Sequence, residues 1–336
     1  MKVLLLLGVV LIHCNLSSDF SASTMQSNCG LQLVNYLSKW LMRVCVPIFY
    51  IISGFLFFNG LNKFSFSTYS EKLRRRVHTL LVPYILWCCF CGVILILKSK
   101  YMGFPGLGVV EDDGHINFLG ALQSFWVVPG NPPYPFAFAF WFIRNLMVFT
   151  LLAPAVWCIA RQWWSYALFM AVYVALDENL YGLEWFITGA AVSLLKIALP
   201  QRVELWIVLT AAMAWIGAAL LLSKLENHIA VHLTMCAAVA AATVVFYFAS
   251  VRFALFFSTR IGSLLVANAF FIYAFHQCFC SMARQLWEKV VGIDTCANVM
   301  LTYMLTFVTL AGVSTIVGTL VKKASPRFFA LITGGR

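Results

Sequence analysis

The sequence predicts an all-α fold, a polytopic bundle of about ten transmembrane helices with both termini in the cytoplasm. The first observation is composition: 62% of the 336 residues are hydrophobic and 10% are charged, whereas charged residues make up about a quarter of a soluble domain. The second is the length of the apolar runs, many of which approach the roughly 20 residues that a helix needs to cross a bilayer. The third is the distribution of Lys and Arg.

About ten apolar runs follow one another along the chain. The backbone of a membrane-spanning segment must form its hydrogen bonds within the segment, so each run is predicted to be a helix. The first and fifth runs are short for complete spans. No polar stretch between them is large enough for a soluble accessory domain, so one membrane domain is expected over residues 1–336. The runs are residues 3–16, 40–58, 79–97, 138–160, 163–176, 182–199, 205–223, 229–249, 264–286 and 299–321.

Lys and Arg residues near span ends favour the cytoplasmic side of a membrane. With the N-terminus inside, the outside loops keep only Lys39, Lys98, Lys100, Lys224, Arg284 and Lys289. The net charge of +11 is then explained by topology and by contact with anionic membrane lipid, so no nucleic-acid partner is expected. The residues assigned to the cytoplasm are Lys2, Lys63, Lys72, Arg74, Arg75, Arg76, Arg161, Lys196, Arg202, Arg252, Arg260, Lys322, Lys323, Arg327 and Arg336.

The first run has a second interpretation, because a basic residue before about ten apolar residues also fits a signal peptide. Cys14 would then suggest a lipoprotein site. However, His13 is a poor substitute for the small residue that precedes such a cysteine, and the first run lacks Ala-x-Ala. An uncleaved first span is therefore preferred. Cys29 and Cys296 both fall in outside loops, where an oxidising compartment permits a disulfide.

Two ionisable side chains stand inside the first two apolar runs, His13 and Arg43. A charged group within a span costs about 2.5 kcal/mol or more, so it persists mainly where it serves a function. A neutral imidazole is suited to take a proton from an attacking hydroxyl, and a guanidinium to stabilise an oxyanion. The alternatives are a histidine that only packs in the bundle and an arginine that reaches the membrane interface.

Two further features of the second run concern its shape. Pro47 leaves the carbonyl of Arg43 without its helical donor and predicts a distortion there. The pair Ser53-Gly54 permits close approach of another helix, and packing alone would explain it.

A basic cluster, Arg74-Arg75-Arg76, ends the loop before the third run. Arginine binds phosphate through bidentate hydrogen bonds, so Arg75 and Arg76 are candidates to hold a nucleotide-bearing acyl donor. Lys2 is a further candidate, at the cytoplasmic surface and about 16 Å from His13 along a helix axis. The alternative is that the cluster only sets topology and contacts anionic lipid.

Later runs carry weaker candidates. Trp141 and Arg144 begin the fourth run, while Tyr273 and His276 share a face of the ninth. An interfacial aromatic anchor and a core histidine are the plain alternatives. The outside loop 98–137, with an interfacial helix expected over 118–128, has the length of a lid or binding element, although a mere tether is equally compatible. No metal site is expected, because His228 and His232 lack a third ligand nearby in sequence.

In order and spacing these motifs resemble the membrane acyltransferase 3 family, which acylates sugars and other acceptors in O-antigens, capsules, peptidoglycan and exported glycans. The similarity runs from Lys2 through the C-terminal span. Lys2 and His13 stand at the family's spacing of a basic residue, ten further residues and a histidine, although in members several residues usually precede the basic position. The matching stretches are residues 43–55, Arg75-Arg76, Pro83-Tyr84, Trp141-Phe142 and Tyr273 with His276.

The resemblance implies a multi-pass protein of the cell membrane, the bacterial inner membrane, that transfers an acyl group from cytoplasmic acyl-CoA, acetyl-CoA in particular. The acceptor would be a hydroxyl or amine of a cell-envelope glycan or lipid-linked molecule. In this scheme His13 acts as base or transient acyl carrier and Arg43 stabilises negative charge. The donor's phosphates would be held by Lys2, Arg75 and Arg76. The substrate would be held by Trp141, Arg144, Tyr273 and His276.

A polytopic transporter or flippase for a glycan or lipid precursor is the alternative from a different class. It would also place charges inside a bundle beside a long outside loop. It predicts paired broken helices in two corresponding halves, and the sequence shows no such internal repeat.

Overall fold

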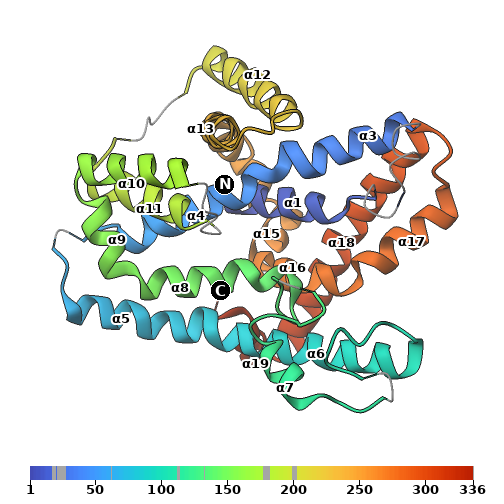
Figure 1. The fold of residues 1–336 in the computed structure, drawn as a ribbon. Coiled ribbons are helices and arrows are strands. Elements are labelled where there is room, and N and C mark those ends of the chain that lie inside the picture. The colour runs from blue at the N-terminus through green and yellow to red at the C-terminus, as the bar shows by residue number, and fades with distance from the viewer. Residues whose placement is uncertain are drawn as a thin grey trace. The chain divides into compact units, whose positions relative to one another are not determined.

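The computed structural model describes residues 1–16, 20, 28–61, 63–111, 114–131, 133–176, 182–198 and 203–335. Regular structure in these residues is helical, apart from isolated bridges of Leu107 with Val110 and of Val110 with Ile116. The chain forms two compact units. Figure 1 shows the helices coloured from blue at the N-terminus to red at the C-terminus. The first unit comprises Met1–Phe64, Ala153–Ala269 and Phe279–Thr315, and the second comprises Ser65–Leu152, Phe270–Cys278 and Ile316–Arg336.

The first unit contains both of the N-terminal apolar runs. Its helices are α1 (Lys2–His13), α3 (Cys29–Asn35), the π-helical turn η2 (Tyr36–Leu41), the 3₁₀ turn η3 (Met42–Val44), α4 (Cys45–Phe58), α9 (Ala153–Ala160), α10 (Trp163–Leu176), α11 (Leu183–Leu194), α12 (Leu205–Leu222), α13 (His228–Arg252), α14 (Ala254–Ser258), α15 (Arg260–Ala267), α17 (Cys280–Val291) and most of α18 (Cys296–Ala324).

The second unit contains the long loop 98–137, which the sequence predicts on the outside, and the third run. Its helices are α5 (Phe66–Arg76), the π-helical turn η4 (Val77–Leu81), α6 (Val82–Met102), α7 (Phe118–Gln123), the 3₁₀ turn η5 (Phe138–Phe140), α8 (Trp141–Leu151), α16 (Ala269–Phe275), the 3₁₀ turn η6 (His276–Phe279), the end of α18 and α19 (Pro326–Thr333).

Each predicted apolar run coincides, over its described residues, with one helix or with a series of consecutive helical segments. Among the described residues, five helices are long and apolar enough to cross a membrane, or up to seven if each of two broken pairs is one span. Three shorter apolar helices are α1, α10 and α11. The protein is therefore a multi-pass membrane protein, as its composition indicates.

The two broken spans have local causes in the sequence. Within run 138–160 the helix stops at Leu152, just before Pro154, which offers no backbone N–H to the preceding turn. Within run 264–286 the buried Asn268 side chain donates from Nδ2 to the carbonyl oxygen of Leu264 at 2.9 Å. Such a bond competes with the helical ladder, and α15 ends there.

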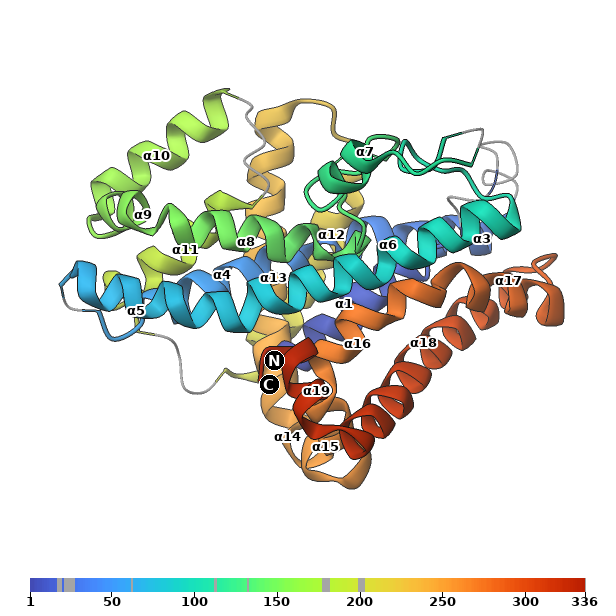
Figure 2. The same cartoon turned by 90° about the horizontal axis from the view of Figure 1, so that it is seen from below.

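The structure corrects the expected form of one loop and the expected length of a helix in another. Residues 66–76, expected in a loop, form α5, because they are rich in Glu, Lys, Leu and Arg and carry an i, i+4 pair of Glu71 with Arg75. In Figure 2 α5 continues through η4 into α6 and runs beside α8; the hydroxyl of Tyr69 donates to the carbonyl oxygen of Leu151 at 3.1 Å. The interfacial helix expected over 118–128 is confined to α7, Phe118–Gln123.

Helices α4 and α11 pack backbone to backbone in the first unit (Figure 1). A Cβ atom at Gly54 would collide with the carbonyl oxygen of Phe186, and one at Gly189 with that of Ile51. Ser53-Gly54 thus permits the close helix approach that the sequence predicts. This contact fixes α4, which continues the segment that carries Arg43.

We expect Gly54→Ala to lower the thermal stability of the purified protein. The new methyl group overpacks the α4–α11 contact, which costs about 1–3 kcal/mol. Gly217→Ala is the matched control, because a Cβ at Gly217 has no atom within 4 Å and alanine favours a helix by about 1 kcal/mol over glycine. Equal melting temperatures for the two variants in detergent would contradict the contact.

Candidate active site

Helix α1 ends inside the first unit, and side chains from two distant segments meet its last turn. The carbonyl oxygen of Leu11 lies 3.2 Å from the Ser38 hydroxyl and 3.1 Å from the Tyr303 hydroxyl. The two hydroxyls lie 3.0 Å apart, and each residue is 1% exposed. The Leu11 carbonyl also accepts from the backbone N–H of Cys14 at 3.2 Å, so backbone and side-chain donors both meet the last turn of this helix. Ser38 of η2 and Tyr303 of α18 therefore stabilise the end of α1.

Two further donors hold the residues around this end. The thiol of Cys280 donates to the carbonyl oxygen of His13 at 3.1 Å, and Nη1 of Arg284 donates to the carbonyl oxygen of Asn15 at 2.5 Å. Both donors come from α17. Because its backbone is fixed by α17 and its preceding turn by η2 and α18, the half-buried His13 stands at a well-defined position.

Arg43 lies in η3, beside the middle of α1. Met42 and Cys45, which flank it, both approach Gly8 of α1, and a Cβ there would collide with the Cys45 sulfur. Gly8 precedes His13 by about 8 Å along the helix axis. The Arg43 side chain is exposed, and its guanidinium stands 5.9 Å from the centre of the Trp40 ring. An interfacial arginine would adopt this arrangement too.

The helical hydrogen bonding is irregular at Arg43, four residues before Pro47. Before α4 the hydrogen bonding changes from π-helical in η2 to 3₁₀ in η3, where the N–H of Cys45 donates to the carbonyl oxygen of Met42. The distortion falls at Arg43, within one helical span over Cys29–Phe58.

The residues predicted to hold phosphate belong to different units. Lys2 begins α1 in the first unit and is exposed. Arg75 and Arg76 end α5 in the second unit, where Arg75 is exposed and pairs with Glu71 at 2.5 Å, while Arg76 is half-buried. An exposed i, i+4 pair is worth little energy, so Glu71 does not prevent Arg75 from binding another anion.

Arg144 is buried in the second unit and holds the outside loop. It is 6% exposed, and its Nη1 donates to the carbonyl oxygens of Trp126 at 2.6 Å and Pro133 at 2.9 Å. Nε and Nη2 donate to Oδ1 of Asn145 at 3.2 Å, and the guanidinium stands 5.0 Å from the centre of the Trp126 ring. These contacts tie the loop to α8.

Two tyrosines hold the same loop in the same way. The hydroxyl of Tyr84 donates to the carbonyl oxygen of Phe125, and that of Tyr273 donates to the carbonyl oxygen of Ala139. Together with Arg144 they satisfy three loop carbonyls, those of Phe125, Trp126 and Pro133, and the carbonyl of Ala139 in η5. These described parts of the loop and the turn after it are thus held on α6, α8 and α16.

Trp141 and His276 complete the residues proposed for the substrate. Trp141 begins α8 and is half-buried. His276 begins η6, is fully buried, and has its Nδ1 atom 2.9 Å from the carbonyl oxygen of Ile272. That contact is the one a packing histidine would make.

The structure therefore divides the predicted residues between the two units. Lys2, His13 and Arg43 belong to the first unit, and Arg75, Arg76, Trp141, Arg144, Tyr273 and His276 to the second. Sequence reasoning missed Ser38, Cys280 and Tyr303, which position the end of α1. Their one signal is a hydroxyl or thiol within or beside an apolar run, and such residues are too common there to be singled out.

This fold and site define a class of protein. It is a helical membrane protein that holds ionisable side chains at fixed positions inside its apolar helices. Residues 1–322 match the family model described as an acyltransferase domain, Acyl_transf_3. The chain belongs to this family and is an acyltransferase, as its motifs indicate.

A more specific relative is found over part of the chain. The chain is similar to the succinoglycan biosynthesis protein ExoH of Rhizobium meliloti (strain 1021), with 28% identity over 158 residues. The match covers 46% of this chain and 40% of that protein, so it spans less than half the length of the curated relative. No solved structure matches the chain significantly.

Replacing Arg144 by Ala is expected to release the outside loop. The variant loses charge-assisted hydrogen bonds worth about 1.5–3 kcal/mol each, so chymotrypsin should cleave within residues 103–137 about tenfold faster or more. Lys100→Ala is the control at an exposed residue beside the loop. Cleavage of the Arg144 variant at the rate of the control would contradict the role of Arg144.

Proposed function

We propose that this acyltransferase moves an acyl group, acetyl in particular, from cytoplasmic acyl-CoA to a hydroxyl or amine of a cell-envelope glycan or lipid-linked acceptor. The family supports the reaction class. The name of the partial relative, a succinoglycan biosynthesis protein, supports a polysaccharide acceptor. The observation that carries the proposal is the position of His13, at a helix end held by side chains from η2, α17 and α18.

In this mechanism His13 removes the proton of the acceptor as the acceptor attacks the acyl carbonyl, or carries the acyl group transiently. The carboxyl end of α1 bears the negative end of the helix dipole, which stabilises the positive charge that the imidazole gains with the proton. Arg43, in the turn beside α1, would stabilise the negative charge that develops on the carbonyl oxygen. Neutral imidazole is then restored when the proton leaves with the released thiol.

The donor and acceptor roles of the other residues follow from their charge and position. Lys2, Arg75 and Arg76 would supply positive charge that attracts the anionic acyl-CoA to the cytoplasmic surface. Trp141, Arg144, Tyr273 and His276 would shape the acceptor side, with Arg144 and Tyr273 acting by holding the outside loop. Membrane lipid is the remaining partner.

The proposed topology has ten spans, both termini in the cytoplasm and a location in the bacterial inner membrane. The five long helices, the two broken pairs and the short helices α1, α10 and α11 supply the spans. Helix α1 is too short to cross the membrane alone, since its 12 residues extend about 18 Å. Side chains of η2, α17 and α18 contact its end inside the protein.

His13→Ala is expected to abolish acyl-CoA-dependent acylation of the acceptor in reconstituted membranes while leaving protein abundance unchanged. General-base catalysis is typically worth about 10²- to 10⁴-fold in rate. His115→Ala, at an exposed histidine of the outside loop, is the matched control and should retain activity. Full turnover by the His13 variant would remove this residue from the mechanism.

A further inference from the structure

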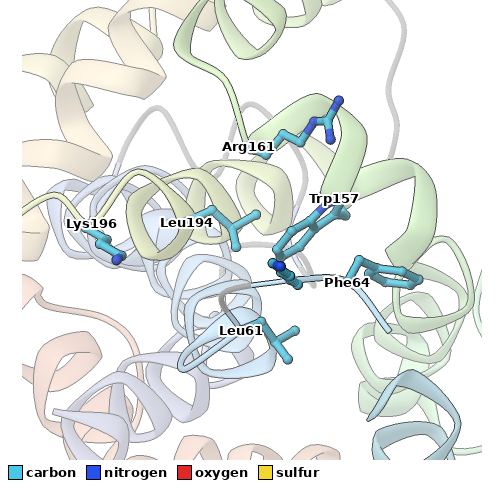
Figure 3. Close-up of a pocket in the computed structure, with 7 residues that line it drawn as sticks. Leu61, Phe64, Trp157, Arg161, Leu194 and Lys196 are labelled. Atoms are coloured by element: carbon cyan, nitrogen blue, oxygen red, sulfur yellow. The ribbon is translucent and has the colours of Figure 1, made fainter. Parts of the chain in front are cut away.

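A pocket of about 740 Å³ opens in the first unit where three inter-helical connections meet (Figure 3). Its size lies within the range of about 300–1,000 Å³ that small-molecule sites occupy. It lies at the ends of α4, α9 and α11. The lining residues are Leu61, Lys63, Phe64, Trp157, Arg161, Leu194 and Lys196.

The charged residues that line this pocket are all basic. Lys63, Arg161 and Lys196 line it, and none of its described lining residues is acidic. The salt bridge found in the described part of the chain is that of Glu71 with Arg75, which involves none of the three. Three cations around one cavity repel one another, so the pocket is suited to an anion with several charges, such as a phosphorylated molecule.

Lys196 is held beside the pocket by the end of α11. It follows this helix with φ = 53°, the left-handed conformation that glycine normally supplies there. The N–H of Ile197 donates to the carbonyl oxygen of Val192 at 3.1 Å and closes the helix end. The backbone that carries the third cation of the pocket is therefore fixed by α11.

The remaining wall is aromatic and apolar. The Trp157 ring stands 6.3 Å from the Phe58 ring and 5.8 Å from the Phe64 ring, measured between centres. In Figure 3 Trp157, Leu194 and Leu61 gather around the middle of the pocket. An indole fixed in this way offers a face on which a planar base can stack. Phosphate groups and a planar base together describe a nucleotide.

The pocket and the proposed reaction centre lie towards opposite ends of α4. The helix begins at Cys45, next to Arg43, and its last residue Phe58 is about 20 Å further along the axis. Leu61 of the pocket follows shortly after. The ligand that connects them must be elongated, with its charged end in the pocket and its reactive end towards α1. A nucleotide joined to a long thioester arm has this form.

We propose that Lys63, Arg161 and Lys196, with Trp157, form the binding site for the phosphorylated nucleotide end of the acyl-CoA donor. The inference rests on the proposed function, which supplies the donor. The cations bind the phosphates and Trp157 stacks on the base. The distribution of Lys and Arg along the sequence predicts all three cations on the cytoplasmic side, where this donor is found.

Binding of coenzyme A to the purified protein in nanodiscs of neutral lipid tests the site. Arg161→Gln and Lys196→Gly should each raise the dissociation constant about tenfold, because each removes a charge-assisted hydrogen bond to phosphate. Lys196→Gly is especially informative, since glycine relieves the strain at φ = 53° and should not lower stability. Arg260→Gln, at an exposed arginine of α15, is the matched control and should bind like the wild type.

Pantetheine and anionic lipid are the comparison ligands. Pantetheine lacks the nucleotide, so the variants should leave its inhibition of acylation unchanged. Coenzyme A binding that is indifferent to Arg161 and Lys196 would overturn the assignment of the pocket, even if acylation from acyl-CoA proceeds. If the variants lose binding of phosphatidylglycerol but keep binding of coenzyme A, the cations bind lipid headgroups. That result would also overturn the assignment of the pocket. A wild-type protein that neither binds coenzyme A nor uses acyl-CoA would instead refute the proposed donor.

Discussion

The end of α1 is the constraint on which the proposed chemistry depends. A helix of 12 residues stops among apolar helices, where water cannot satisfy its last carbonyls. Ser38 and Tyr303 meet at the carbonyl of Leu11, and Cys280 and Arg284 bind the next turn. The same contacts that satisfy the backbone therefore fix His13. A polar side chain near this point thus has a stable position, which a reacting group needs.

In the second unit, side-chain donors likewise hold backbone carbonyls, here in the loop 98–137 and the turn after it. Arg144 and Tyr84 donate to carbonyl oxygens of the loop, and Tyr273 donates to that of Ala139 in η5, so a loop rich in turn residues is held on helices α6, α8 and α16. Tyr84, Arg144 and Tyr273 therefore have a structural role, which is to hold backbone carbonyls, and their sequence pattern does not reveal it. A loop held in this way can present a constant surface to an acceptor.

Much of the fold was predictable, because hydrophobic runs report directly on burial in a membrane. Pro47 also revealed the distortion at Arg43 through its missing N–H. Residues 66–76 were predicted to be a loop. They form α5 instead, because charged residues with high helix propensity extend the helix from α6 through η4 toward the N-terminus. The site was less predictable. Ser38 and Tyr303 are ordinary residues until the fold brings them together, and the charge rule places Lys63, Arg161 and Lys196 on one side without indicating that they line one pocket.

Tyr303→Phe tests the central claim most directly, because it removes the hydroxyl at the end of α1 and keeps the ring. Loss of one buried hydrogen bond, about 1 kcal/mol, should loosen the position of His13. We expect a kcat lowered about fivefold or more, with the KM for acyl-CoA and the protein abundance unchanged, while Tyr101→Phe at an exposed residue has no effect. An unchanged kcat in the Tyr303 variant would contradict the claim that the held end of α1 positions His13 for the proposed reaction.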